Sequence, residues 1–172
     1  MHFTSEQRLD GDVVERDFTV GDIPGILWTP ASTPVPTPLI LLGHPGGVRA
    51  MYPRLAARAR AAVAQGFAAA TIEAPGSGGR PASADADQAR ADLRRAITAG
   101  ERPSEDVIDR LVLPLVEQAV PEWQAALDDL LELPEIGGPV GFSGGVIAVG
   151  VQSSARCALA RSQAAVRIAS VA

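Results

Sequence analysis

A serine set among glycines stands near the end of the sequence, in the pattern Gly141-Phe142-Ser143-Gly144-Gly145. Small residues on both sides of a serine permit a sharp turn from a strand into a helix, which projects the serine Oγ from the end of a sheet. A short apolar stretch precedes the pattern and a longer one follows it, as such a turn requires. The pattern therefore predicts a nucleophile for acyl transfer. An incidental serine in a glycine-rich turn is the alternative.

A serine hydroxyl reacts poorly unless a base lies within hydrogen-bond reach and an acid orients that base. Both histidines, His2 and His44, precede Ser143, and Glu135 is the last carboxylate in the sequence. We interpret His2 as a solvated terminal residue and His44 as a residue that shapes the turn after a strand, rather than as the base. Glu73 also ends a predicted strand, where a carboxylate is more often solvated or paired than functional.

The chain before the serine predicts a sheet with a crossover helix. The first thirty residues alternate in polarity around a turn at residues 20–23, which favours an antiparallel hairpin, and residues 31–38 hold three prolines and predict a surface loop. Residues 39–42 are continuously apolar, as in a strand buried on both faces. Residues 52–66 favour a helix, and residues 67–75 a second buried strand. Strand, helix, strand is the pattern of a right-handed crossover in a parallel sheet.

A charge-rich region, residues 84–133, predicts helices beyond the single crossover helix. We expect three of them, over residues 86–100, 104–120 and 121–133. Ser104 is suited to cap the second helix, and Pro114 to kink or end it. The extra helices imply an insertion that covers one face of the sheet and the substrate pocket. Residues 136–145 contain the last strand that the sequence indicates.

Three segments, residues 39–47, 66–80 and 141–145, resemble the α/β-hydrolase superfamily, nearest to its dienelactone-hydrolase-like and small serine esterase branch. The resemblance covers residues 1–152 as the N-terminal part of a hydrolase domain. It implies a partial α/β-hydrolase fold: a mostly parallel sheet with an N-terminal antiparallel hairpin, helices on both faces, and the C-terminal strands missing.

The resemblance also implies roles for single residues. Ser143 is the expected nucleophile. The backbone N–H groups of Gly144 and of Gly46 or Gly47 are expected to stabilise the oxyanion of the tetrahedral intermediate. His44 is expected to have a structural role in the oxyanion loop.

The sequence departs from the family where the family has its acid and base, which follow the serine in chain order. No histidine or carboxylate follows Ser143, and residues 153–172 also lack glycine, proline and aromatic residues. We therefore expect residues 153–172 to be an atypical tail of frameshifted or truncated origin. Cys157, within that tail, is expected to be a buried apolar residue or a surface thiol.

Two functions remain open at this point. One is a serine hydrolase for small carboxylic esters, lactones or thioesters whose acid and base this chain lacks, so that it is inactive alone. The other is a truncated or degenerate hydrolase fragment that acts as an interaction module. Either reading leaves an exposed sheet edge, which a second copy or a complementing chain is expected to pair with.

Composition excludes several other classes of function. The net charge is −5, and the 15 basic residues, all of them arginine, form no cluster that would follow a phosphate backbone, so nucleic acid is not an expected partner. One cysteine and two histidines predict no protein-built metal site, and no cofactor is implied. A membrane-spanning helix needs about 18 consecutive apolar residues, and no run in this sequence is that long. The polar N-terminus is unlike a secretory signal, so the sequence predicts a cytoplasmic protein with no membrane partner.

Overall fold

The structure is a computed structural model that describes residues 1–32 and 36–144 of the 172-residue chain. The predictions for Cys157, for the tail and for the residues after Gly144 lie outside the described residues. The elements are, in chain order, β1 (His2–Leu9), β2 (Val13–Val20), β3 (Ile23–Pro30), β4 (Thr37–Leu42), α1 (Val48–Val63), β5 (Ala68–Ile72), α2 (Ala84–Ala99), α3 (Glu105–Leu131) and β6 (Ile136–Ser143).

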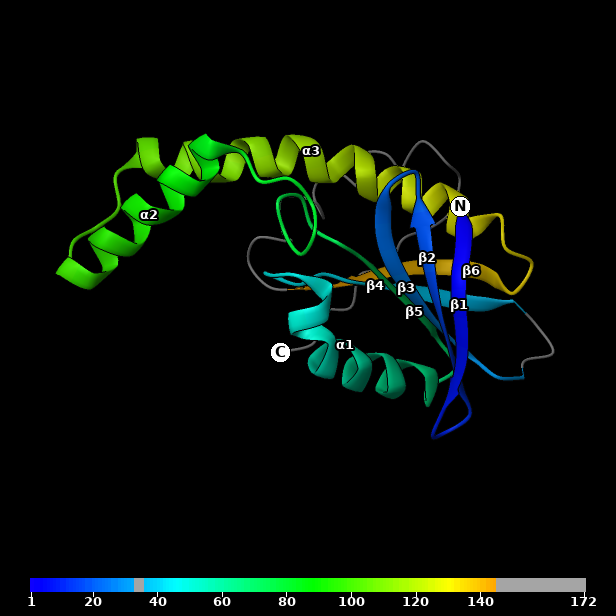
Figure 1. The fold of residues 1–172 in the computed structure, drawn as a ribbon. Helices are drawn as coiled ribbons and strands as arrows, with labels where there is room; N and C mark the ends of the chain where they lie inside the picture. The colour runs from blue at the N-terminus through cyan, green and yellow to red at the C-terminus, as the bar shows by residue number, and fades with distance from the viewer. Residues whose placement is uncertain (33–35, 145–172) are drawn as a thin grey trace.

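The strands form one mixed sheet in the order β1-β2-β3-β5-β4-β6 (Figure 1). β4 pairs in parallel with β5 on one side and with β6 on the other, whereas β1, β2, β3 and β5 pair with one another antiparallel. The predicted hairpin of β2 and β3 and the predicted crossover from β4 through α1 to β5 are both confirmed. The antiparallel part is larger than predicted, because β1 extends the hairpin to three strands.

The sheet has helices on both faces, as expected, and side chains alternate between two cores (Figure 1). Leu39 and Leu41 of β4 contribute to the core beneath α3, while Leu42 contributes to the core against α1. The central strand β5 carries small side chains: residues 68–70 are alanines, each 0% exposed. Such small side chains let α1 approach the middle of the sheet closely.

The helices of the inserted region differ in one respect from the prediction. α2 begins after the N-cap Ser83 and ends at Gly100, which has a left-handed φ of 71°. α3, however, is one helix of 27 residues that contains both Pro114 and Pro121, so the prediction of two separate helices was wrong. The two prolines are seven residues apart and both are exposed, so the missing N–H groups lie on the solvent side.

Packing keeps α3 continuous past the prolines. The buried residues of its C-terminal half, Ala119, Trp123, Ala126, Leu127 and Leu130, all belong to the core on that face of the sheet. The N-terminal half of α3 instead extends past the sheet with α2 beside it (Figure 1). The predicted N-cap of the region, Ser104, is confirmed, because its Oγ accepts the N–H of Val107.

Candidate active site

The carboxyl ends of the three parallel strands meet at one edge of the sheet. β4 ends at Leu42, β5 at Ile72 and β6 at Ser143, and Leu42 lies opposite Ser143 in the register of β4 and β6. Loops that leave parallel strands in the same direction converge, and ligands of α/β proteins bind at this edge. The serine and the glycine turn that the sequence singled out therefore lie on neighbouring strands.

Ser143 is the last residue of β6 and its side chain is exposed. Its backbone carbonyl accepts the N–H of Gly43, at 2.9 Å, which continues the pairing of β6 with β4 by one residue. Its Oγ accepts a hydrogen bond from the Arg58 guanidinium, at 2.7 Å. Gly144 is the last described residue here, so the strained turn and the donor role of its N–H group stay predictions.

The glycine turn after β4 leads directly into α1. Gly47 is the N-cap of the helix, with an extended backbone (φ −67°, ψ 142°), and Gly46 precedes it. Helix N-termini carry unsatisfied N–H groups and partial positive charge, which suits this turn to a developing oxyanion. The assignment of Gly46 or Gly47 as the donor stays a prediction.

A carboxylate caps α1 in place of a polar N-cap side chain. Both oxygens of Glu73 lie within hydrogen-bond distance of the Val48 N–H, at 3.0 and 3.2 Å, and Glu73 is only 6% exposed. The carboxylate also lies against Gly78, where an added Cβ would be 2.4 Å from Oε2. Glu73 thus fastens the turn after β5 to the turn after β4, a contact between loops that the sequence alone does not reveal.

His44 faces away from the serine. Its Nε2 lies 3.0 Å from the carbonyl oxygen of Ile72, so Nε2 carries the proton and donates it. Ile72 belongs to β5, which lies on one side of β4, whereas Ser143 belongs to β6 on the other side. This position agrees with a structural role for His44. His2, by contrast, is exposed on β1, at the opposite end of the strand order.

Arg58 of α1 is a contact to Ser143 that the sequence does not single out. Its Nη2 donates to the carbonyl oxygen and to Oγ of Ser143, both at 2.7 Å, and its Nη1 donates to the carbonyl of Gly43 at 3.3 Å. Burial lowers the pKa of the Arg58 guanidinium from its usual value. The sequence does not distinguish Arg58 from the other arginines of this alanine-rich helix. Which of them points toward Ser143 depends on how α1 packs on the sheet.

A second buried carboxylate fixes the beginning of α1 to the hairpin. Glu15 of β2 is 3% exposed and accepts hydrogen bonds from the Tyr52 hydroxyl, the Trp28 indole N–H and the Gln7 amide. Burial raises the pKa of the Tyr52 hydroxyl, and the hydrogen bond to Glu15 raises it further. The helix that carries Arg58 is therefore held at its N-terminal turns by two buried acids.

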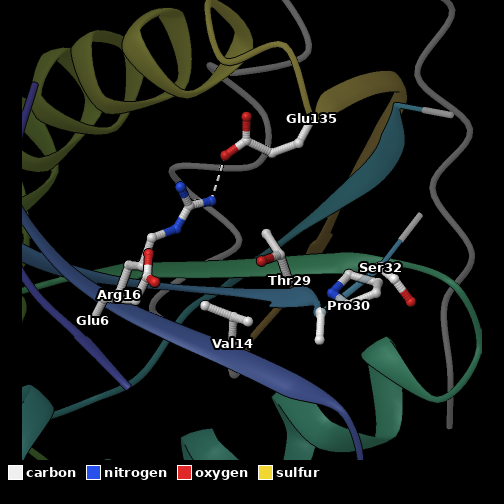
Figure 2. Close-up of a pocket in the computed structure, with 8 residues that line it drawn as sticks. Glu6, Val14, Arg16, Thr29, Pro30, Ser32 and Glu135 are labelled. Atoms are coloured by element: carbon white, nitrogen blue, oxygen red, sulfur yellow. Dashed lines mark hydrogen bonds and ion pairs between the residues drawn. The ribbon is translucent and has the colours of Figure 1, made fainter. Parts of the chain in front are cut away.

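An open hollow of about 660 Å³ lies elsewhere, beside the N-terminal end of β6 (Figure 2). Arg16 and Glu135 form an ion pair in it, with Glu6 and Thr29 in the lining. The hollow lies at the beginning of β6 and Ser143 at its end, so the eight residues of the strand, roughly 26 Å at about 3.3 Å per residue, separate them. It is separate from the edge where the strand ends converge.

The described residues contain neither a metal-binding cluster nor a membrane-spanning helix. No group of three or more histidine, cysteine or acidic side chains within residues 1–32 and 36–144 is arranged to hold a metal ion. No helix of the described structure is both long and apolar enough to cross a membrane.

No family model matches this sequence, and no curated protein matches it either. Solved structures do match. A cold-adapted esterase from an Arctic intertidal metagenomic library, in a PEG-bound complex, is 24% identical with a TM-score of 0.56, over 90% of this chain and 59% of its own. Its zinc-bound form is 21% identical with a TM-score of 0.57, over 94% and 60%.

A putative acetyl xylan esterase from Bacteroides fragilis is more distant: 18% identical with a TM-score of 0.56, over 88% of this chain and 43% of its own. The chain thus spans about 43–60% of the length of these esterases. Likeness at this level of identity defines the fold. The chain has a partial α/β-hydrolase fold, as the sequence predicted.

Proposed function

We propose that Ser143 is the nucleophile of a serine hydrolase of the α/β-hydrolase type, acting on a small carboxylic ester, lactone or thioester. The observation that carries this proposal is the position of Ser143: it is exposed at the carboxyl end of a parallel strand and paired to the strand that leads into the glycine turn. The structural neighbours, which are esterases, support the same chemistry. The dienelactone-hydrolase-like branch remains our preferred relative within the superfamily.

The proposed reaction has two steps. Ser143 Oγ attacks the acyl carbon while a base takes its proton, and the leaving alcohol or thiol departs with that proton. Water then attacks the acyl group and releases the acid. The N–H groups of Gly144 and of Gly46 or Gly47 are the proposed oxyanion donors in both steps.

These 172 residues do not supply the base in the family's order, and His44 donates to a carbonyl on the far side of β4. The proposal therefore includes an imidazole and a carboxylate from another segment or chain. β6 is an edge strand of the described sheet, and a second copy or a complementing chain is proposed to add its strand there.

Fluorophosphonate labelling of the purified chain tests the proposal. The probe forms a bond from phosphorus to the serine oxygen and releases fluoride, and peptide mass spectrometry locates the adduct. We expect the adduct on Ser143 and its loss in Ser143→Ala. Ser5→Ala is a matched control, because Ser5 is an exposed serine that donates to the Asp17 carboxylate and should not affect labelling.

The absence of an adduct in a folded sample, both alone and after a C-terminal partner is added, would contradict the proposal and favour the non-catalytic interaction module. Labelling that appears only after a C-terminal partner is added would support both the nucleophile and the complementing chain.

A further inference from the structure

The guanidinium of Arg58 has an unusual set of partners. It lies half-buried on α1 and its hydrogen-bond acceptors are two backbone carbonyls and one hydroxyl, from Gly43 and Ser143. Within residues 1–32 and 36–144 no carboxylate forms an ion pair with it, whereas Arg16 and Arg80, whose side chains are 15% and 12% exposed, each pair with a glutamate. A positive charge without a balancing anion is therefore held at the exposed serine.

Half-burial of this charge without an anion has a desolvation cost. Removing an ion from water is unfavourable, and buried charges are usually paired for that reason. Burial lowers the pKa of Arg58, but a guanidinium begins so high that it stays charged at neutral pH. The charge is thus permanent, and the Ser143 Oγ lies 2.7 Å from it.

We infer that Arg58 is a further catalytic residue of the proposed ester hydrolase: its guanidinium holds Ser143 Oγ in place and stabilises the negative charge that this oxygen gains as its proton leaves. The inference rests on the proposed function. Oγ accepts the Arg58 N–H through one lone pair, which leaves its own proton free for the base and a second lone pair for attack on the acyl carbon.

The same guanidinium connects the two parts of the proposed site. Its two terminal nitrogens bind the carbonyl of Gly43, where the glycine turn begins, and the carbonyl of Ser143, where β6 ends. A planar fork can hold both strand ends and the hydroxyl at once, whereas a lysine offers the charge at a single point. Substitutions of Arg58 can therefore distinguish the effect of its positive charge from the effect of its planar shape.

The test measures the second-order rate constant of fluorophosphonate labelling at Ser143 in four proteins. We expect Arg58→Gln to slow labelling about tenfold or more, because hydrogen bonds to charged groups differ from neutral ones by roughly that factor in equilibrium terms. Arg58→Lys should recover part of the rate, and millimolar guanidinium ion should accelerate Arg58→Gln. Arg54→Gln, on the exposed side of the same helix, should label like the wild type.

The outcomes separate the two proposals. If the wild type labels at Ser143 and Arg58→Gln, shown to be folded by its thermal unfolding, labels equally fast, the role of Arg58 is overturned while the nucleophile stands. If Arg58→Gln and Arg58→Lys slow equally and guanidinium ion rescues neither, Arg58 only holds the strand ends and the inference also fails. If the folded wild type labels neither alone nor after a C-terminal partner is added, the proposed function fails and this inference fails with it.

Discussion

Replacing Glu73 by alanine tests whether a buried acid holds the two glycine turns together. The substitution leaves the buried Val48 N–H without an acceptor, which costs about 1–3 kcal/mol. It also removes a negative charge from the N-terminus of α1, which costs a further ~0.5 kcal/mol. We expect Glu73→Ala to lower the free energy of unfolding by about 2–3 kcal/mol. Glu73→Gln should lower it by only about 1 kcal/mol, because the amide oxygen still accepts the N–H.

Gly78 makes this prediction sharper. Its φ is +59°, and an added Cβ would lie 2.4 Å from Glu73 Oε2. Gly78→Ala in the wild type therefore combines a left-handed backbone penalty of about 1 kcal/mol with a clash. In the Glu73→Ala background the clash disappears and only the backbone penalty remains. The double variant should be more stable than the sum of the single effects predicts, by about 1 kcal/mol.

Urea unfolding followed by tryptophan fluorescence measures these free energies. The chain has two tryptophans, Trp28 and Trp123, and both are buried in the cores on either face of the sheet. Glu101→Ala removes an exposed carboxylate and should change the free energy of unfolding by less than about 0.5 kcal/mol. A Glu73→Ala protein as stable as this control, or strictly additive effects with Gly78→Ala, would refute the capping role.

Three other predictions concern single positions. Tyr52 is the sole tyrosine, so the phenolate absorbance of the folded chain should titrate above pH 10.0, and Glu15→Gln should move that titration down. Because the folded state favours the neutral phenol, its contribution to stability is present below about pH 10 and is lost as the pH rises through the folded pKa, which thermal unfolding against pH would detect. Gly25→Ala adds a Cβ at 2.4 Å from a buried phenylalanine ring and should cost about 1–3 kcal/mol in urea unfolding, whereas Gly79→Ala, with nothing within 4 Å, should be near neutral. Pro114→Ala should raise stability and helical circular dichroism, by about 1 kcal/mol or more, because it restores an intrahelical hydrogen bond in the continuous α3; a loss of stability would contradict the continuous helix.

The parts of this fold that the sequence predicts are those whose signal is local. The apolar runs of β4 and β5 and the glycine turn between β4 and α1 can be read directly, because burial on both faces and tight turns restrict composition at those positions. β1 could not be found in this way. Its eight residues are all exposed or half-exposed, so no side of the strand needs apolar residues. The prediction divided α3 at Pro121, because the packing that keeps the helix continuous is not visible in a local window of sequence.

In the candidate site, too, the sequence predicted the residues with a local signal and missed the contacts that depend on the fold. Ser143 and the glycines were found from a short motif with its own backbone requirement. Glu73 and Arg58 were not, since each acts across a large sequence separation: Glu73 on Val48 and Arg58 on Ser143, which is 85 residues away. A carboxylate at a strand end and an arginine in a helix have many ordinary uses, and only the sheet order brings these two to the same edge.

The strand order also sets a sequence of events during synthesis of the chain. All partners of β1, β2, β3 and β5, together with α1 and the core on its face, lie within the first 72 residues, so that layer can assemble early. One side of β4, however, is completed by β6, and residues 43–135 come between them. At about 5–20 residues per second, the ribosome leaves that apolar edge unpaired for roughly 5–20 s. Until α3 and β6 are made, the unpaired edge of β4 and the sheet face beneath α3 are therefore the apolar surfaces of the nascent chain open to chaperones.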